Sequence, residues 1–137
     1  LEVAERIVAP PGSRTYGALS VNVQAIATAE IISQVPRSAF RPPPKVTSAI
    51  VRITPRSDAI VMGDEAIRFR SFVQGLFGMR RKQIANVIRL VSTLSTTQVA
   101  EVLQSLDIDP KARPETLSPI AQVELMRAVR KARGQQA

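Results

Sequence analysis

Apolar residues follow two different periods along the chain, and the change falls near residue 60. Before it, helical spacing alternates with short apolar runs, whereas after Asp64 apolar side chains keep the 3.6-residue period of amphipathic helices. We therefore predict an α+β fold. A mixed N-terminal part, residues 1–54, is joined by a linker, residues 55–63, to an all-α part, residues 64–137.

The N-terminal part is predicted to begin with two helices. Apolar residues within 1–8 recur at helical spacing until Pro10 and Pro11 end the first helix. Residues 19–29 fit both a strand and a helix, because Val21 and Val23 alternate while other apolar residues follow the helical period. Their length and their three alanines favour a helix.

Residues 30–35 and 46–53 are predicted to be strands. Pro36 stops the first, and the second is rich in β-branched residues with little polarity, which predicts a strand covered on both faces. A short connection favours an antiparallel pair. Because two strands alone make a poor sheet, this part is interpreted as the last third of a larger α/β domain.

The all-α part is predicted to be a small bundle of four helices. Ser95 with Gln98 forms a capping box before one helix, and Ser118 with Pro119 begins the last. The phenylalanines at 69, 72 and 77 are interpreted as core residues. The predicted apolar stripes are Phe69, Phe72, Val73, Leu76 and Phe77; Ile84, Val87, Ile88 and Val91; and Val99, Val102, Leu103 and Leu106.

Composition narrows the chemistry. The 137 residues carry 19 Lys and Arg against 11 acids, a net charge of +8, which favours a polyanionic partner such as nucleic acid. The absence of Cys and His excludes disulfides, a Cys/His zinc site and a histidine base. No apolar run is long enough to span a membrane, and residues 1–8 do not resemble a signal peptide, so we expect a cytoplasmic protein. Because the chain starts without Met in a helical pattern, we expect natural sequence upstream.

A basic cluster, Arg80-Arg81-Lys82, lies between the first two predicted helices of the all-α part. No acid stands three or four residues after any of these cations. Lys82, Asn86 and Arg89 are predicted to share one helical face opposite the apolar stripe. This pattern suits phosphate contact, although a solvated helix end has the same pattern.

The loop containing Tyr16 also leaves two interpretations open, since the ring could be buried under its loop or could contact a ligand.

Four ordered segments resemble one family. They are Glu2-Val3-Ala4-Glu5-Arg6-Ile7 with Pro11-Gly12-Ser13 and Tyr16-Gly17; Val35-Pro36 with Phe40-Arg41-Pro42-Pro43-Pro44-Lys45-Val46-Thr47-Ser48; Phe77 with Arg80-Arg81-Lys82; and Leu106-Asp107-Ile108-Asp109-Pro110 with Arg113 and Glu115. Together they are similar to the KsgA-type rRNA adenine N6-dimethyltransferases. Asp107 stands where that family usually has Gly, which bears on how the preceding helix ends.

The resemblance implies the last helices and antiparallel strand pair of a Rossmann-like methyltransferase domain, followed by a helical rRNA-binding domain. It implies dimethylation of two adjacent adenosines near the 3′ end of small-subunit rRNA with S-adenosylmethionine as cofactor. The family's glycine-rich cofactor turn and its N-L-P-Y motif are absent from this sequence. The resemblance further implies that Phe40 stacks on the target adenine and that Arg80, Arg81 and Lys82 bind rRNA. We also expect RNA contacts from Lys45, Arg14 and Arg89.

We therefore expect a truncated methyltransferase that is inactive alone and whose partner is small-subunit rRNA in the 30S precursor. We expect a monomer that does not associate with membranes. Two alternatives stay open. One is a stand-alone RNA-binding or ribosome-interaction module without catalysis. The other is a relative of the macrolide-resistance methyltransferases of large-subunit rRNA, although the Asp109-Pro110 ending favours the KsgA side.

Overall fold

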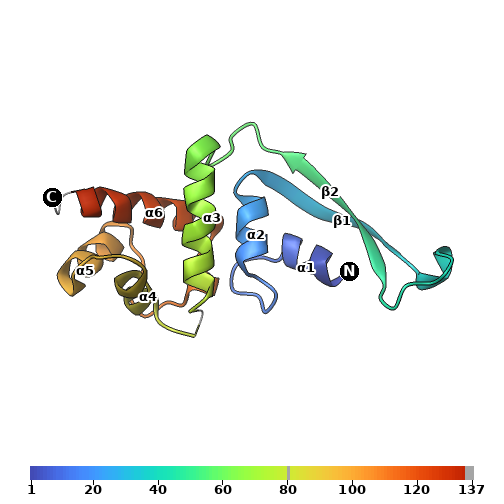
Figure 1. The fold of residues 1–137 in the computed structure, drawn as a ribbon, viewed down its shortest axis with the longest axis horizontal. Helices are drawn as coiled ribbons and strands as arrows, with labels where there is room; N and C mark the ends of the chain where they lie inside the picture. The colour runs from blue at the N-terminus through green and yellow to red at the C-terminus, as the bar shows by residue number, and fades with distance from the viewer. Residues whose placement is uncertain (80, 135–137) are drawn as a thin grey trace.

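The computed structural model describes residues 1–79 and 81–134. Within them the chain forms six α-helices, two short 3-10 helices and one two-stranded sheet, which confirms the α+β prediction. The helices α4, α5 and α6 gather at one end, α3 stands in the middle, and the hairpin of β1 and β2 extends to the other end (Figure 1).

The N-terminal part consists of α1 (Glu2–Val8), α2 (Ala18–Gln24), β1 (Ala27–Val35) and β2 (Ser48–Pro55). The predicted helix over residues 19–29 was wrong in its second half, since α2 ends at Gln24. Residues 27–29 instead pair with residues 53–55 of β2. Hydrogen bonding to the partner strand outweighs the helix propensity of the alanines, because propensity is only a weak preference.

The two strands form the predicted antiparallel pair. Ile32 is an extra residue in β1, so the register shifts by one between Ile31 and Ser33, as in a β-bulge. Glu30 and Arg52 are register partners, and their side chains form an ion pair of 2.9 Å on an exposed face. The hairpin is therefore joined by main-chain bonds along its whole length, with one charged pair added.

The prediction that residues 46–53 are covered on both faces was wrong. Val46, Ile50 and Ile53 are 68%, 53% and 51% exposed. β-Branched residues favour any strand, whether or not a layer covers it. Here β2 packs mainly against β1 and α1, so most of its apolar side chains have no covering layer within the described residues.

The four predicted helices of the C-terminal part are confirmed. They are α3 (Gly63–Phe77), α4 (Ile84–Val91), α5 (Thr96–Ser105) and α6 (Pro119–Gly134). The capping box before α5 is present, because Ser95 Oγ accepts from Gln98 N at 3.1 Å and Gln98 Oε1 accepts from Ser95 N at 2.9 Å. Ser118 Oγ likewise accepts from Ala121 N at 3.1 Å at the start of α6. The apolar residues of α4 and α5 pack with Leu76 of α3 and with Leu125 and Val129 of α6 into one buried cluster.

A second buried cluster joins the N-terminal part to the helices. It contains Tyr16 and Val21 from the N-terminal part, Phe69 and Val73 from α3, and Met126 from α6. The segment 55–63 also folds back, since Arg56 N donates to Ile26 O at 2.9 Å and Ile60 N donates to Ala25 O at 3.0 Å. The division at residues 54 and 64 stays a prediction, and the two parts share a core across it.

Helix α5 ends in a left-handed residue. Asp107 has φ 55°, Ile108 N donates to Leu103 O at 2.9 Å, and Asp107 N donates to Gln104 O at 3.1 Å. These two bonds are those of a Schellman motif, whose left-handed position is usually Gly. Asp107 therefore takes over the conformational role of the Gly that is usual there.

Candidate functional site

Phe40 lies at the far end of the hairpin, in the loop that joins β1 to β2. A short 3-10 helix, η1 (Arg37–Ala39), precedes it, and its backbone N donates to Arg37 O at 3.2 Å. Its side chain is 42% exposed, whereas Phe69 is buried and belongs to the core. The ring therefore serves no core in the described structure and is accessible to a planar ligand.

Cations flank this aromatic residue along the loop. Arg37, Arg41 and Lys45 are all exposed, and one Arg37 guanidinium nitrogen lies 3.5 Å from the Lys45 carbonyl oxygen across the loop. Prolines 42–44 stiffen the return to β2 because their φ angles are fixed. An exposed ring between positive charges can stack on a base while the cations contact its phosphates. We call Arg37, Phe40, Arg41 and Lys45 the hairpin tip.

A second basic surface forms where three loops meet beside the end of α3. The loops contribute Arg14, from the α1–α2 connection; Arg81 and Lys82, from the α3–α4 turn; and Lys111 and Arg113, from the segment after α5. All five are exposed, and none forms an ion pair with another described residue. We call this set the basic edge.

Hydrogen bonds between distant residues bring these loops together. Gly12 N donates to Glu115 O at 2.7 Å, which ties the first loop to the third. Ile84 N donates to Ala112 O at 2.5 Å and Ala85 N to Pro110 O at 3.2 Å, which ties the third loop to the start of α4. Because these backbone N–H groups already donate to carbonyl oxygens of the protein, an anion at the basic edge would be bound by the cationic side chains.

The edge differs in part from the prediction. Lys82 was predicted to share a helical face with Asn86 and Arg89, but α4 begins at Ile84, so Lys82 lies in the preceding turn with its N bonded to Met79 O at 3.0 Å. Asn86 and Arg89 are exposed on α4 as expected. Arg80, also predicted to bind RNA, lies outside the described residues.

Lys111 and Arg113 were missed as candidate binding residues. They follow α5 by several residues, and only the bonds from the start of α4 to Pro110 and Ala112 bring them beside the α3–α4 turn. The available signal was two positive charges in a segment that is not predicted to be helical and so offers them no ion pair along a helix. However, Lys111 is two residues from Asp109 and Arg113 is two residues from Glu115, so the sequence was equally compatible with a solvated loop of mixed charge.

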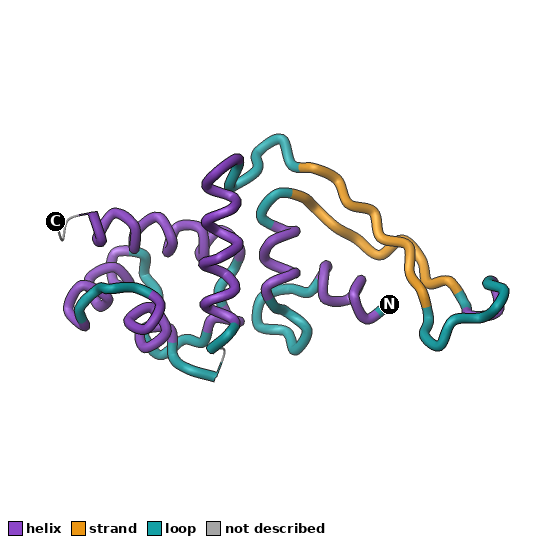
Figure 2. The backbone as a smooth tube through the Cα atoms, viewed as in Figure 1, coloured by secondary structure: helices purple, strands orange, loops and turns teal. Residues whose placement is uncertain are grey.

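The hairpin tip and the basic edge are separate surfaces. The tip stands at one extreme of the longest axis, and the α3–α4 turn lies near the helical end (Figure 2). The structure therefore does not bring Phe40 and Lys45 together with Arg81 and Lys82. One ligand could contact both only if it extends along the protein's long axis, which suits a folded nucleic acid better than a small molecule.

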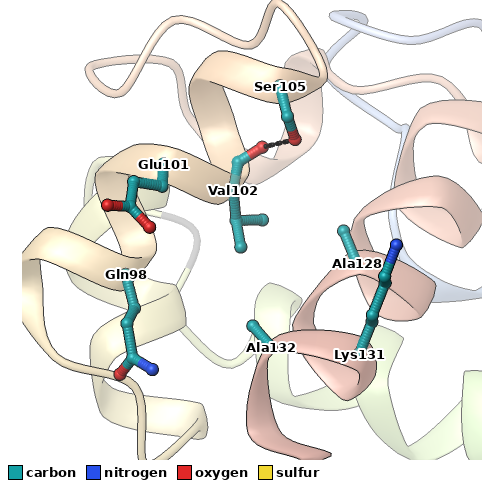
Figure 3. A pocket seen from close by; sticks show the side chains of 7 residues that line it. All are labelled: Gln98, Glu101, Val102, Ser105, Ala128, Lys131 and Ala132. Atoms are coloured by element: carbon teal, nitrogen blue, oxygen red, sulfur yellow. Dashed lines mark hydrogen bonds between the residues drawn. The ribbon is translucent and has the colours of Figure 1, made fainter. Parts of the chain in front are cut away.

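A hollow of about 270 Å³ lies between α5 and α6 (Figure 3). Glu101 on α5 and Lys131 on α6 stand on opposite walls, and Ser105 Oγ donates to Val102 O at 2.7 Å. The hydroxyl thus already has a backbone partner. In the part of the chain that the structure describes, no group of three acidic side chains could hold a metal.

The described residues do not fit a binding site for S-adenosylmethionine. Nucleotide-like cofactors of doubly wound enzymes bind at the carboxyl ends of parallel strands, beside a glycine-rich turn and a ribose-binding acid. Residues 1–79 and 81–134 hold one antiparallel strand pair and no such turn. Within the same residues, no helix is both long enough and apolar enough to cross a bilayer.

The described residues thus form a basic α+β fold with an exposed aromatic residue at the hairpin tip and a separate cationic edge, a combination typical of proteins that bind nucleic acids. The family model of ribosomal RNA adenine dimethylase matches residues 1–126. The chain belongs to this family, and the resemblance to KsgA-type enzymes is confirmed.

Curated relatives agree with this assignment. The chain is 46% identical over 124 residues to "Ribosomal RNA small subunit methyltransferase A" of Nostoc sp. (strain PCC 7120), covering 90% of this chain and 45% of the relative. It is 43% identical over 133 residues to the protein of that name from Psychrobacter cryohalolentis, covering 97% and 46%. The chain thus spans about half the length of the curated relatives it matches.

Two solved structures share the fold. A dimethyladenosine transferase from Plasmodium falciparum superposes with a TM-score of 0.80 at 22% identity, covering 96% of this chain and 55% of that one. The 23S rRNA methyltransferase ErmE superposes with a TM-score of 0.65 at 23% identity, covering 95% and 52%. At these identities the likeness concerns the fold alone.

Proposed function

We propose that this chain forms the C-terminal part of an rRNA adenine N6,N6-dimethyltransferase. The substrate would be two adjacent adenosines near the 3′ end of small-subunit rRNA, in a 30S precursor in the cytoplasm, and the protein would act as a monomer. The family match over residues 1–126 and the printed names of the relatives support this proposal. Neither supports a stand-alone binding module.

The observation that carries the proposal is the exposed ring of Phe40 among cations. An enzyme that methylates a base must first take it out of its stack, and the extruded base regains stacking energy on an aromatic side chain. Phe40 has the exposure for this role, and Arg37 and Arg41 supply charge for the flanking phosphates. Lys45 would add a further contact on the same loop.

The basic edge would hold the rRNA at a distance from the reacting base. Arg81, Lys82 and Arg14 are exposed and unpaired within the described residues, so their charges are free for phosphates. We include Arg80 and Arg89 among the residues proposed to contact rRNA phosphates, because they are close in sequence to Arg81 and Lys82. Binding through phosphates positions a nucleic acid without reading its sequence.

The hairpin with its exposed apolar faces suits the end of a larger Rossmann-like sheet. We assign S-adenosylmethionine, the methyl donor of such a reaction, to the part of the family enzymes outside the matched length. The chain alone is then inactive. Calorimetric titration of this chain with S-adenosylmethionine tests this point: we expect no saturable heat, and saturable micromolar binding would refute it.

A chimera tests the whole proposal. The matching segment of the Nostoc enzyme is replaced by this chain, and transfer of radiolabelled methyl groups to immature small subunits is measured. We expect dimethyladenosine at the same positions as with the parent enzyme. A folded chimera that binds S-adenosylmethionine but methylates no rRNA would contradict the proposal, and the Nostoc enzyme without the segment is the blank.

A further inference from the structure

A groove of about 400 Å³ lies where α3 and α6 cross and the end of α4 closes one side. Met126 and Val129 of α6 are buried along it, and Phe72 and Val91 are half-buried in its walls. Gly75 adds no side chain to the lining, and a Cβ there would make an ordinary van der Waals contact of 3.4 Å with Val91 Cγ1. The groove is therefore lined mainly by aliphatic, thioether and ring carbon atoms.

An unburied aliphatic side chain stands on the rim. Ile67 of α3 is 61% exposed beside the groove, although the buried stripe of the same helix runs through Phe69, Val73 and Leu76. The exposed Ile67 and the half-buried wall form one continuous apolar strip. A contiguous exposed apolar strip on a soluble domain marks an interaction site more often than a scattered apolar residue does.

Three arginines flank this strip: Arg68 of α3 and Arg130 and Arg133 of α6. The nearby carboxylate, Glu65, is already bound by Arg127, with Oε1 2.6 Å and Oε2 3.1 Å from guanidinium nitrogens. None of the three arginines forms an ion pair with another described residue. The rim is thus positively charged, and its guanidinium groups can donate hydrogen bonds to external carboxylates.

The chemistry of the groove favours a protein segment over RNA. Single-stranded nucleic acids need exposed rings on which bases stack, and here the one ring, Phe72, is half-buried in a wall. An amphipathic helix instead inserts aliphatic side chains at i, i+3, i+4 and i+7 into such a groove. Carboxylates beside that stripe would form charge-assisted bonds with the arginines.

We propose that the α3–α6 groove docks an acidic amphipathic helix of a partner protein. The aliphatic stripe of that helix fills the groove beside Ile67 and Phe72, and its flanking acids pair with Arg68, Arg130 and Arg133. The site uses residues of α3 and α6 that belong to neither the hairpin tip nor the basic edge, so RNA and this partner can bind together.

The test uses the full chain and a fluorescein-labelled peptide of about 16 Leu, Ala and Glu residues, a length that is marginally helical in water. Its leucines follow the i, i+3, i+4, i+7 spacing with Glu on both sides. Fluorescence anisotropy should give a Kd of tens of micromolar, which corresponds to a standard binding free energy of about −6 kcal/mol. One control peptide has the same composition with the leucines scattered around the helix, and another has Lys in place of Glu.

Variants locate the binding. Arg68→Glu with Arg130→Glu should weaken the peptide at least about tenfold, because like charges replace attractive ones. Ser71→Trp, an exposed lining position, should block the groove to a similar extent without changing charge. Arg70→Glu with Lys131→Glu is the matched charge control outside the groove and should leave the Kd unchanged. Circular dichroism confirms that each variant is folded.

Three results would overturn the proposal. They are equal binding of the patterned and scattered peptides, an unchanged Kd in folded Ser71→Trp, and absence of saturation at millimolar peptide. A single-stranded RNA that displaces the peptide, and whose own affinity falls with Ser71→Trp, would also overturn it by assigning the groove to nucleic acid.

Discussion

The phenolic hydroxyl of Tyr16 donates a hydrogen bond of 2.7 Å to the backbone carbonyl of Leu117, across a sequence separation of 101 residues. The ring is fully buried and meets Phe77 edge-on, with centroids 5.9 Å apart. This one side chain thus connects the loop of Arg14 to the end of α3 and to the segment before α6, which are the elements that carry the basic edge.

Replacing Tyr16 by Phe should destabilise the protein by about 1 kcal/mol, the typical worth of one buried hydrogen bond. The loss stays at this level because Leu117 O also accepts from Gln122 Nε2 at 3.0 Å and is not left unpaired. Urea denaturation measures the change. Burial raises the pKa of Tyr16 well above its ordinary 10.0, so the folded state keeps the phenolic proton where the unfolded chain releases it.

The sign of the pH effect follows. Stability from the protonated hydroxyl is fully present below pH 10 and falls as the pH rises above it. The Phe variant lacks this titration, so its stability deficit should shrink when the pH is raised from about 8 to about 10.5. An unchanged urea midpoint at pH 8, or a constant deficit across this range, would contradict the role given to Tyr16.

Replacing Asp107 by Gly should stabilise the protein by about 0.5–1 kcal/mol. Asp107 has φ 55°, a backbone conformation that is strained for a residue with a Cβ and unstrained for Gly. Its side chain is exposed, so little packing is lost. Thermal denaturation should show a higher Tm for Asp107→Gly and a lower one for Asp107→Val, whose β-branch disfavours this region. A lower Tm for the Gly variant would contradict the left-handed helix end.

The basic edge can be tested by the salt dependence of RNA binding. Each lost phosphate contact lowers the slope of log K against log salt by roughly 0.7 to 0.9, so Arg81→Ala with Lys82→Ala should flatten it by about 1.4 to 1.8. The control is Arg70→Ala with Lys131→Ala, which removes the same charge elsewhere. Arg127 is unsuitable as a control because Glu65 binds it. Equal flattening by both pairs would indicate a diffuse basic surface.

Sequence periodicity predicted what depends on neighbouring residues. The stripes of α3, α4 and α5 and the caps at Ser95 and Ser118 follow from residues within one or two turns, and the structure confirms them. The burial of residues 46–53 was mispredicted because β-branched composition indicates a strand but not what covers it. Propensity also could not decide where α2 ends.

The candidate site was predictable only in part, for the same reason. Phe40 and Lys82 could be proposed from motifs, whereas Arg113 joins the edge only through bonds of the α4 start to Pro110 and Ala112. Tyr16 could equally have been a surface contact, because its buried partner, Leu117, is far away in sequence. Contacts of this range depend on tertiary packing, which local periodicity does not encode.

The most direct test of the account is a Phe40 series in the chimera with the Nostoc enzyme, read as kcat/KM for methyl transfer to small subunits. Stacking of one base is worth about 1–3 kcal/mol, so Phe40→Ala should lower kcat/KM by about 5- to 150-fold. Phe40→Tyr should stay within about threefold, because it keeps an aromatic face. A Phe40→Ala chimera as active as its parent, or a Tyr variant as impaired as the Ala variant, would contradict the stacking role.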